Sequence, residues 1–485
     1  MMRPNWRRRY RRTTIVLLGC AAFLAGLLIA RTRVQISGAW LLPLSGFALF
    51  SLRRKDFLTA LAIIFLFATL GWWRGGNYLQ QLQPYHTFDG QKVSLTGSAA
   101  IDAVYGKNGQ LTFTVNHVQF VSPVNKALPG TIKVSGFGVP MVFRGDQVRV
   151  SGKLYASRGA SQANVSFAII DVFGSRPSFV DSVRRRFTAG MQSALPEPLA
   201  SFGLGLLVGQ RNTLPPEVAQ ALLMVGLTHI IAVSGYNLTI LLEVSRRLLG
   251  KRSKFQSTLA ALALIGTFLL FAGSSASIVR AAVISIIGLA AWYYGRTIKP
   301  VLLILLAAAL TAYANPVYLW SDISWYLSFL AFFGVLVLAP LIVRRFLGAK
   351  QPRLLTQIMI ESLCAQIMTI PIVLFIFGQV SLVGMIANML VVALIPLAML
   401  LSLIAGVAGM LIPAIAGWFA WPAQVLLTYM LDVATMLSRI PHAFVQHVTL
   451  SIAGMSLLYA STLGLLVVMW SRERRKAGIL TDITD

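Results

Sequence analysis

Long blocks of apolar residues recur along the chain, and each is long enough to form a membrane helix. A helix needs roughly 20 apolar residues to cross the hydrocarbon core of a bilayer, which is about 30 Å thick. Blocks of this kind lie near 13–30, 35–52, 57–74, 228–245, 256–273, 276–294, 300–314, 323–342, 355–378, 418–438 and 450–470. Together with the apolar region 380–416, they predict a polytopic α-helical membrane protein with roughly ten to twelve spans.

Two regions depart from this pattern. Residues 177–227 contain apolar segments too short to cross a membrane unaided, so we expect an amphipathic or re-entrant helical segment there. Residues 380–416 are long enough for two helices, but Pro396, Gly406 and Pro413 interrupt them. Interrupted backbone at membrane depth is tolerated only where protein buries it or where it lines a cavity. This favours a pore or vestibule near residues 380–416.

Residues 76–176 follow a different pattern, in which apolar and polar positions alternate. Val, Thr, Gly and aromatic residues replace the Leu and Ala blocks, as is typical of strands. Five stretches fit this description: KVSLTGSAAIDAVYG, QLTFTVNHVQFV, TIKVSGFG, DQVRVSGKLYA and NVSFAIIDVF. They predict a small all-β domain inserted between the membrane helices. A partly open barrel of the OB type fits, and a β-sandwich fits almost as well.

Charge predicts the orientation. The chain carries 42 Lys and Arg against 15 Asp and Glu, and most of this excess lies in short loops, as the positive-inside rule requires. Six arginines within residues 1–12 and the cluster 53–55 place the N-terminus and the second loop in the cytoplasm. Residues 1–75 then form N-terminal spans of the cytoplasmic membrane, and the β domain is extracytoplasmic. The tail 472–485 is cytoplasmic if residues 380–416 cross an odd number of times.

The β domain carries a net positive charge, which is unexpected on the outer side of the membrane. It holds nine cations against four aspartates, although the positive-inside rule depletes cations outside the membrane. Cations combined with aromatic residues such as Tyr105, Phe113, Phe137 and Tyr155 suit single-stranded DNA, because bases stack on rings while Lys and Arg follow the phosphates. The alternative is that most of these rings form the core of the domain. The candidate DNA-binding cations are Lys92, Lys107, Lys133, Arg144, Arg149, Lys153 and Arg158.

Ionisable side chains inside membrane spans are costly and therefore indicate function. Arg280 lies inside a span and follows three serines, so it could hold a passing phosphate. Equally, it could pair with the carboxylate of Asp322, which could also cap the next helix. Gln366 and Asn388 stand in apolar surroundings, where hydrogen bonds between helices would explain them equally well.

The stretch THIIAVSGYNLTILL, residues 228–242, has polar residues within an apolar block. His229 and Ser234 are five positions apart, about 140° around a helix, so a catalytic pair within this helix is not expected. Ser234 and Asn237 share a face, and Gly235 lets backbone or substrate approach closely. Polar contacts between helices are the alternative explanation.

The surrounding run, GLLVGQRNTLPPEVAQALLMVGLTHIIAVSGYNLTILL, resembles the signature region of the ComEC family of DNA internalisation competence proteins. Three later segments resemble the family in order: SSASIVRAAVIS, NPVYLWSDISWYLSFLAFFGV and AQIMTIPIVLFIFGQVSLVGMIANMLVVALIP. The family pattern falls on Gly205, Gly209, His229, Ser234, Gly235, Arg280, Ser328, Pro371, Gln379 and Asn388.

The resemblance implies a channel, residues 228–471, that conducts single-stranded DNA across the cytoplasmic membrane. Its path residues would be His229, Ser234, Gly235, Asn237, Arg280, Asp322, Ser328, Gln366 and Asn388. Implied partners are single-stranded DNA, a DNA receptor on the outer face and membrane lipid. No Walker A motif occurs, so a cytoplasmic helicase or ATPase is also implied.

The chain differs from the family pattern in three respects. Tyr236 and Asn237 stand where the family commonly has a second histidine, and the β domain lacks the cysteine pair often seen there. The HxHxDH cluster of the family's metallo-β-lactamase-like domain is absent from the sequence. We therefore expect no enzyme activity, metal or cofactor in this chain, and a separate nuclease. Two rival functions remain: an intramembrane hydrolase with Ser234 as nucleophile and a histidine from another helix, and a secondary transporter that holds a small anion on Arg280.

Overall fold

The fold is taken from a computed structural model that describes residues 10–481. It leaves out residues 33, 35, 52–55, 106–109, 123–124, 129, 140, 157–160, 176, 211–212, 232–252, 273–275 and 349–351. The chain divides into two compact units. Unit 1 comprises Met1–Arg184 and Leu249–Tyr326, and unit 2 comprises Arg185–Leu248 and Leu327–Asp485.

Eight helices in the described part of the chain are long and apolar enough to cross a membrane. They are Arg12–Thr32, Phe57–Thr87, Lys254–Ala272, Ile323–Leu347, Thr356–Phe377, Gly384–Leu411, Pro413–Ser438 and Ile452–Met469. Four shorter apolar helices accompany them: Gly38–Ser51, Leu199–Val208, Ser277–Tyr293 and Pro300–Ala314. The predicted class, a polytopic helical membrane protein with an inserted β domain, is confirmed. Predicted span 228–245 lies almost entirely outside the described residues.

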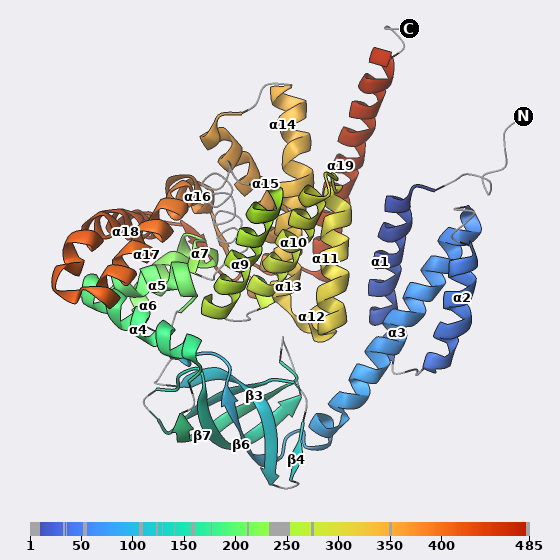
Figure 1. The fold of residues 1–485 in the computed structure, drawn as a ribbon. Coiled ribbons are helices and arrows are strands. Elements are labelled where there is room, and N and C mark those ends of the chain that lie inside the picture. Colours follow the sequence, from blue (N-terminus) through green and yellow to red (C-terminus); the bar gives the residue numbers. More distant parts are fainter. Residues whose placement is uncertain are drawn as a thin grey trace, which may run out of the picture. The chain divides into compact units, whose positions relative to one another are not determined.

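Unit 1 begins with three helices, α1 (Arg12–Ile29), α2 (Leu41–Ser51) and α3 (Phe57–Thr87), which lie side by side (Figure 1). Small residues let α1 and α3 approach backbone to backbone. A Cβ on Gly26 would lie 2.0 Å from the Ala68 carbonyl oxygen, and one on Gly71 would lie 2.2 Å from that of Phe23. Close contact of this kind replaces the hydrophobic effect as the force that joins helices in lipid.

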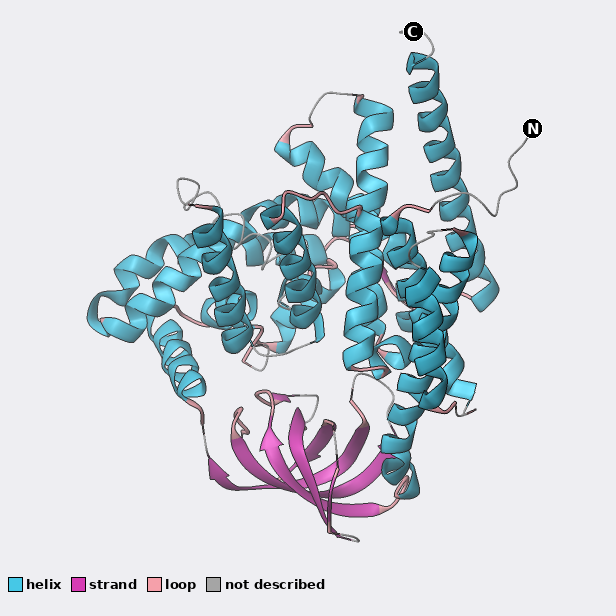
Figure 2. Cartoon of the chain, turned by 45° about the vertical axis from the view of Figure 1, so that its right-hand side comes forward, coloured by secondary structure: helices cyan, strands magenta, loops and turns pink. Residues whose placement is uncertain are grey.

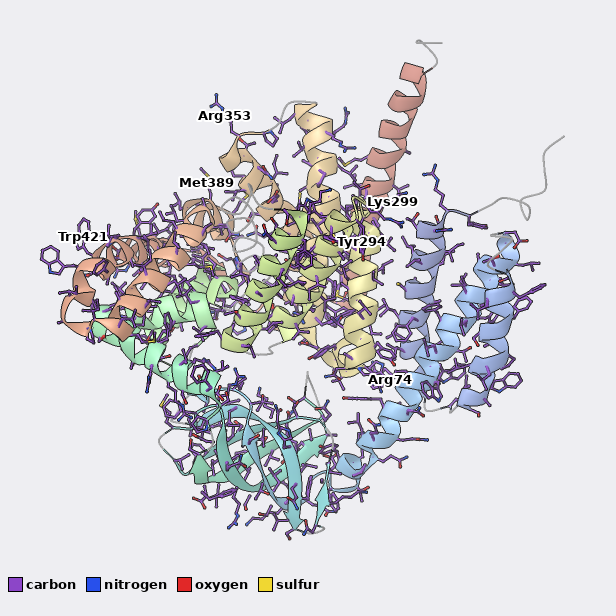
Figure 3. The ribbon with its side chains drawn as sticks, in the orientation of Figure 1. Arg74, Tyr294, Lys299, Arg353, Met389 and Trp421 are labelled. Carbon is purple, nitrogen blue, oxygen red and sulfur yellow. The ribbon has the colours of Figure 1, made fainter. Side chains whose placement is uncertain are left out.

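Four further helices complete the helical part of unit 1: α9 (Lys254–Ala272), α10 (Ala276–Tyr293), α11 (Pro300–Ala314) and α12 (Val317–Ser321). Helix α11 packs against α1 and α10, and α10 packs against α9. Arg74 of α3, labelled in Figure 3, donates to the carbonyl oxygens of Tyr313 and Ala314 at 3.2 and 3.4 Å. It therefore satisfies two of the carbonyl groups that the end of α11 leaves free.

The predicted β domain is present. Four of the five predicted stretches each contain one long strand, whereas the first, residues 92–106, divides into two strands. The long strands are β1 (Lys92–Ala99), β3 (Leu111–Ser122), β5 (Ile132–Phe137), β6 (Asp146–Ala156) and β7 (Ala163–Ser175), with short β2 (Val104–Tyr105) and β4 (Lys126–Ala127) beside β3. Hydrogen bonds run around the circuit β1–β6–β7–β5–β3–β1, so the sheet closes on itself (Figure 2). Only the β5–β7 pair among these is parallel. The closed circuit decides for a barrel and against a sandwich.

Alternate residues of each strand fill the barrel, as the twofold period of a strand requires. Leu95, Val134, Val150 and Val165 are fully buried. Phe113 is buried with them, so for this ring the core explanation holds.

Unit 2 is helical. Its elements are α5 (Leu199–Val208), α6 (Pro216–Met224), α7 (Thr228–Ile231), the π-helical turn η5 (Gly334–Leu338), α14 (Ala339–Leu347), α15 (Leu354–Phe377), β8 (Val380–Ser381), α16 (Gly384–Val391), η6 (Val392–Leu394), α17 (Ile395–Leu411), η7 (Pro413–Ile415), α18 (Ala416–Ser438), β9 (Phe444–Val445) and α19 (Ile452–Thr481). Helices α4 (Phe179–Ala194) and α13 (Ile323–Phe333) pass from unit 1 into unit 2. On α18, Trp421 is exposed and projects outward (Figure 3), as a lipid-facing side chain does.

The interrupted region 380–416 forms one candidate span rather than two. Its helical run Gly384–Leu411 is 28 residues long and contains the 3₁₀ turn η6 just before Pro396. A Cβ on Gly409 of α17 would lie 1.9 Å from the carbonyl oxygen of Gly190 in α4, so this helix also packs backbone to backbone. If this helical run crosses once, that is the odd number the charge pattern requires, and the cytoplasmic position of the tail stays a prediction.

Candidate nucleic-acid interface

Cations and exposed aromatic rings alternate on the outer face of the barrel. Arg149 of β6 lies over the ring of Phe173 of β7, with its guanidinium carbon 5.8 Å from the ring centre. Lys153 and Tyr155, both on β6, form a similar pair at 6.0 Å. Cation–π contact holds each charge next to an exposed ring. We call the outer surface of β1, β6, β7 and β5 the barrel face.

Two lysines meet on the barrel face. Lys92 of β1 stands directly opposite Lys153 of β6 in the antiparallel register. Like charges directly opposite one another destabilise a sheet. An anion bound between them would remove this repulsion, so the pair is a candidate phosphate site.

The sequence analysis did not identify Phe167, the most exposed aromatic side chain of the barrel face. The side chain of Phe167 on β7 is 76% exposed, and Ile169 beside it is exposed as well. Phe167 has a φ of +53°, and the register between β6 and β7 shifts next to it. Phe137 of β5, which the sequence did single out, is paired with Ile169 and is also exposed. The apolar part of the face is therefore continuous across β5 and β7.

The predicted DNA-binding cations separate into three groups. Lys92, Lys133, Arg149 and Lys153 project from strands of the barrel face. Arg144 is engaged elsewhere, as described next. Lys107 and Arg158 lie outside the described residues.

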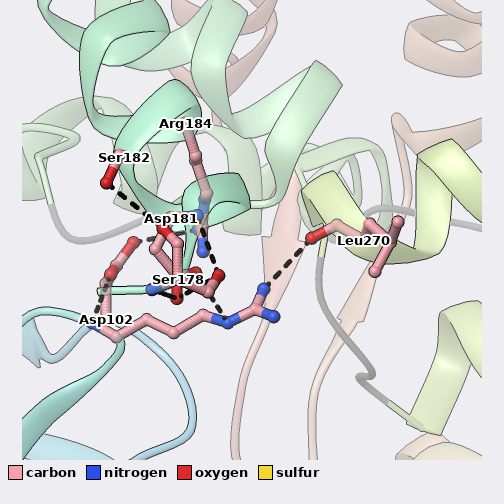
Figure 4. A network of polar contacts seen from close by, with 7 residues as sticks. Asp102, Ser178, Asp181, Ser182, Arg184 and Leu270 are labelled. Atoms are coloured by element: carbon pink, nitrogen blue, oxygen red, sulfur yellow. Dashed lines mark hydrogen bonds and ion pairs between the residues drawn. The ribbon is translucent and has the colours of Figure 1, made fainter. Parts of the chain in front are cut away.

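Arg144 belongs to an ion-pair network between the barrel and α4 (Figure 4). Its Nε lies 3.1 Å from a carboxylate oxygen of Asp181 in α4, and its Nη1 donates to the Leu270 carbonyl oxygen at 3.2 Å. Arg184 of α4 in turn lies 2.9 Å from a carboxylate oxygen of Asp102. Burial lowers the pKa of Arg184, and the Asp102 carboxylate opposes that shift. The network fastens the barrel to α4 and α9, which makes Arg144 a structural residue in addition to a DNA candidate.

Arg280 forms an ion pair with the buried Asp322, which is one of the two alternatives that the sequence left open. Its side chain is only 1% exposed, and its Nη1 lies 3.7 Å from a carboxylate oxygen of Asp322. Its Nη2 donates to the carbonyl oxygen of Ser324 at 3.0 Å and to the Ser324 hydroxyl at 3.2 Å. Asp322 also accepts from the Ser324 N–H at 3.0 Å, so it caps α13 as well. Arg280 thus joins α10 to the start of α13.

A second set of polar residues meets in unit 2. His229 is exposed, and its Nδ1 lies 3.0 Å from the carbonyl oxygen of Gly226. A Cβ on Gly226 would lie 3.4 Å from Cβ of Ser381, and one on Gly384 would lie 3.4 Å from both Ser381 Oγ and Gln366 Nε2. An added methyl group at either glycine would therefore be in van der Waals contact with these polar groups.

The amide of Asn388 lies one turn further along α16. Its Nδ2 donates to Ser362 Oγ at 2.7 Å, whereas its Oδ1 is buried and has no hydrogen-bond partner in the described structure. The structure thus brings His229, Gln366 and Asn388 into one region, which we call the polar cluster together with Ser362 and Ser381. Buried unpaired acceptors are costly, so the cluster has capacity to bind a donor.

Residues 206–473 match the family model described as "Competence protein". The chain belongs to the competence protein family, of the ComEC type. The ComE operon protein 3 of Bacillus subtilis (strain 168) is 27% identical over 248 residues, which is 50% of this chain. The aligned part is 30% of that relative's length. No solved structure matches significantly. Membership supports a role in DNA uptake during competence.

Two glycines of the competence signature have clear structural roles. Gly209 ends α5 with a φ of +74°, and its N–H donates to the Gly205 carbonyl oxygen at 3.1 Å. A Cβ on Gly205 would lie 2.5 Å from the side chain of Ile231, so only glycine lets α5 and α7 pack here. The signature therefore fixes the start of the segment that carries the THIIAVSG motif.

The remaining predicted path residues of this competence protein are distributed. Ser328 lies half-buried on α13. Ser234, Gly235 and Asn237 lie outside the described residues. Within the described part of the chain, no group of three or more His, Cys, Asp and Glu side chains could hold a metal ion.

Proposed function

We propose that this competence protein conducts single-stranded DNA across the cytoplasmic membrane during natural transformation. The observation that carries the proposal is the barrel face, where Arg149 and Lys153 lie against the rings of Phe173 and Tyr155. Lys92 lies opposite Lys153 on this face, and the ring of Phe167 is exposed there. A surface that offers rings for bases and cations for phosphates suits a single strand without sequence preference.

The barrel collects the strand on the outer side of the membrane. Its closed five-stranded circuit, with a parallel pair that includes the last strand, supports an OB-type fold, a type that binds oligonucleotides. The charge pattern supports an extracytoplasmic position, since the cations of residues 1–12 and 53–55 favour the cytoplasm. Bases stack on Phe167 and Phe173 while phosphates meet the lysine pair.

The strand then passes the polar cluster in unit 2. Neutral amides and hydroxyls, such as those of Gln366, Asn388 and Ser381, suit a passage, because a polyanion must leave as readily as it enters. Arg280 does not act as a free anion ligand in this proposal. Its ion pair with Asp322 joins α10 to the start of α13, which also weakens the anion-transporter alternative.

Transport of a polyanion requires other proteins. The sequence contains no Walker A motif, so a cytoplasmic helicase or ATPase supplies the driving force. A receptor on the outer face delivers the DNA, and a separate nuclease removes the second strand.

Cells that carry Phe167→Ala with Phe173→Ala test the proposal. Uptake of labelled DNA into the cytoplasm should fall strongly, and purified double variant should bind an oligonucleotide more weakly. Phe179→Ala is the matched control, because this ring is also exposed but lies on α4 outside the barrel face. Unchanged transformation after deletion of the gene would refute the proposal.

A further inference from the structure

A cavity of about 450 Å³ lies where the end of α3 meets strands β3 and β4, away from the barrel face. Helix α3 runs down to this edge of the barrel (Figures 1 and 2). The volume lies within the range of roughly 300 to 1,000 Å³ that is typical of small-molecule sites. All residues that line the cavity belong to unit 1.

Apolar side chains form one part of the cavity lining. Phe88 stacks on the buried ring of Phe120, with ring centres 5.7 Å apart and planes inclined by 28°. Pro84 and Leu128 also belong to this apolar lining. Phe88 is only half-buried, so part of it is available to a planar ligand.

The rim of the cavity is polar. Gln80 and Gln83 lie three residues apart on α3, so their exposed amides share one face of the helix. Lys126 of β4 is exposed and supplies the one cation of the lining. The lining therefore combines aromatic rings, two amides that can donate and accept, and one positive charge.

We infer that this cavity binds a single deoxynucleotide. The base would lie against Phe88, the amides of Gln80 and Gln83 would meet its polar edge, and Lys126 would meet the phosphate. The inference extends the proposed function, because the incoming strand is one source of such a nucleotide. The other source is free nucleotide released when the second strand is degraded.

Titration of the full-length purified protein with deoxycytidine monophosphate, followed by saturation-transfer NMR, tests the inference. Lys126→Gln and Gln83→Leu should each weaken binding about ten-fold or more, because each removes a contact to a polar or charged ligand group. Deoxyribose 5-phosphate, which lacks the base, should bind at least about ten-fold more weakly than the nucleotide. Lys254→Gln, a change at an exposed lysine of α9, is the control and should have no effect. Equal binding by all variants, or by both probes, would overturn the inference.

Two further measurements cover variants that do not fold and identify the source of the nucleotide. If a variant fails to fold, photolabelling of the wild-type protein with 8-azido-deoxyadenosine monophosphate replaces it: label within 80–88 or 126–128 supports the cavity, and label elsewhere refutes it. Competition by a short oligonucleotide would identify the strand as the source of the nucleotide, and lack of competition would identify free nucleotide. Phe173→Ala should weaken oligonucleotide binding to the barrel face while leaving mononucleotide binding intact, so failure of the proposed function can be told apart from failure of the cavity.

Discussion

Lys153 of β6 faces Lys92 of β1 across the antiparallel ladder of the barrel. Nothing about barrel stability favours this arrangement, because opposed like charges cost free energy. The pair is understandable if an anion binds there. An anion bound between the two lysines would therefore also stabilise the barrel.

Lys92→Gln removes the repulsion and leaves the Lys153–Tyr155 contact in place, so it should raise the free energy of unfolding of the barrel by a few tenths of a kcal/mol, up to about 1 kcal/mol, in the absence of DNA. The same change should reduce the salt dependence of oligonucleotide binding by about one phosphate contact, a slope change of about 0.7. Thermal unfolding and titrations at several salt concentrations measure the two effects. A stability loss combined with an unchanged salt slope would show that the pair does not bind phosphate.

Two phenylalanines of the barrel should respond in opposite ways to truncation. Phe113→Ala removes a buried ring and should lower the free energy of unfolding by about 3–5 kcal/mol. Phe167→Ala removes an exposed ring and should leave stability nearly unchanged while weakening oligonucleotide binding by about 1–3 kcal/mol. Denaturation curves and binding titrations on both variants test this contrast. Equal loss of stability would place Phe167 in the core.

Removal of one partner of the Arg280–Asp322 pair should be more harmful than removal of both. Either single change, Arg280→Met or Asp322→Asn, leaves a buried group without its counter-charge and should cost about 3–5 kcal/mol. The double variant should recover much of that loss. The amount of protein that survives heating in detergent, measured for all four forms, gives the coupling. If Arg280 were a free anion ligand, Asp322→Asn would leave stability unchanged.

Gly409→Ala should disrupt unit 2, because the added Cβ would lie 1.9 Å from the backbone oxygen of Gly190. Gly417→Ala, where the added carbon has open space, is the matched control. Yield of folded protein in membranes reports the difference. Equal yields would contradict the backbone contact between α4 and α17.

Asn388→Ala should separate DNA capture from DNA entry. The residue is remote in sequence from the β domain and donates to Ser362 Oγ within the polar cluster. Surface-bound DNA should therefore stay at the wild-type level while DNA in the cytoplasm falls about ten-fold or more. Ser402→Ala, which changes another buried polar residue of unit 2, controls for packing. A parallel fall of bound and internalised DNA would argue against a passage at Asn388.

The strands could be predicted because alternation is a local signal, yet the barrel face could not. Val165 is buried, so strict alternation along β7 would bury Phe167 and Ile169 as well. The left-handed backbone of Phe167 reverses the order, and Ala168 and Ile170 turn inward instead. A single irregular residue thus places the most exposed ring of the barrel face where the twofold period predicts a core position.

The polar cluster could not be predicted from the sequence for a different reason. Helices in a membrane are apolar on all sides, so no period marks the face that meets a passage. Gln366 and Asn388 could be identified because polar residues are rare in membrane helices. That they lie close to Ser381 and Gly226 follows only from the fold. Ser381 and Ser362 carry no signal in the sequence, since serine is common between helices.

The length of α3 has a mechanical consequence. Its 31 residues extend about 46 Å, which exceeds the bilayer core of about 30 Å by roughly ten residues. The last turns of α3 extend to the barrel, and they carry Gln80 and Gln83. If the barrel binds a strand as proposed, α3 is the spacer that sets the distance between that strand and the lipid headgroups.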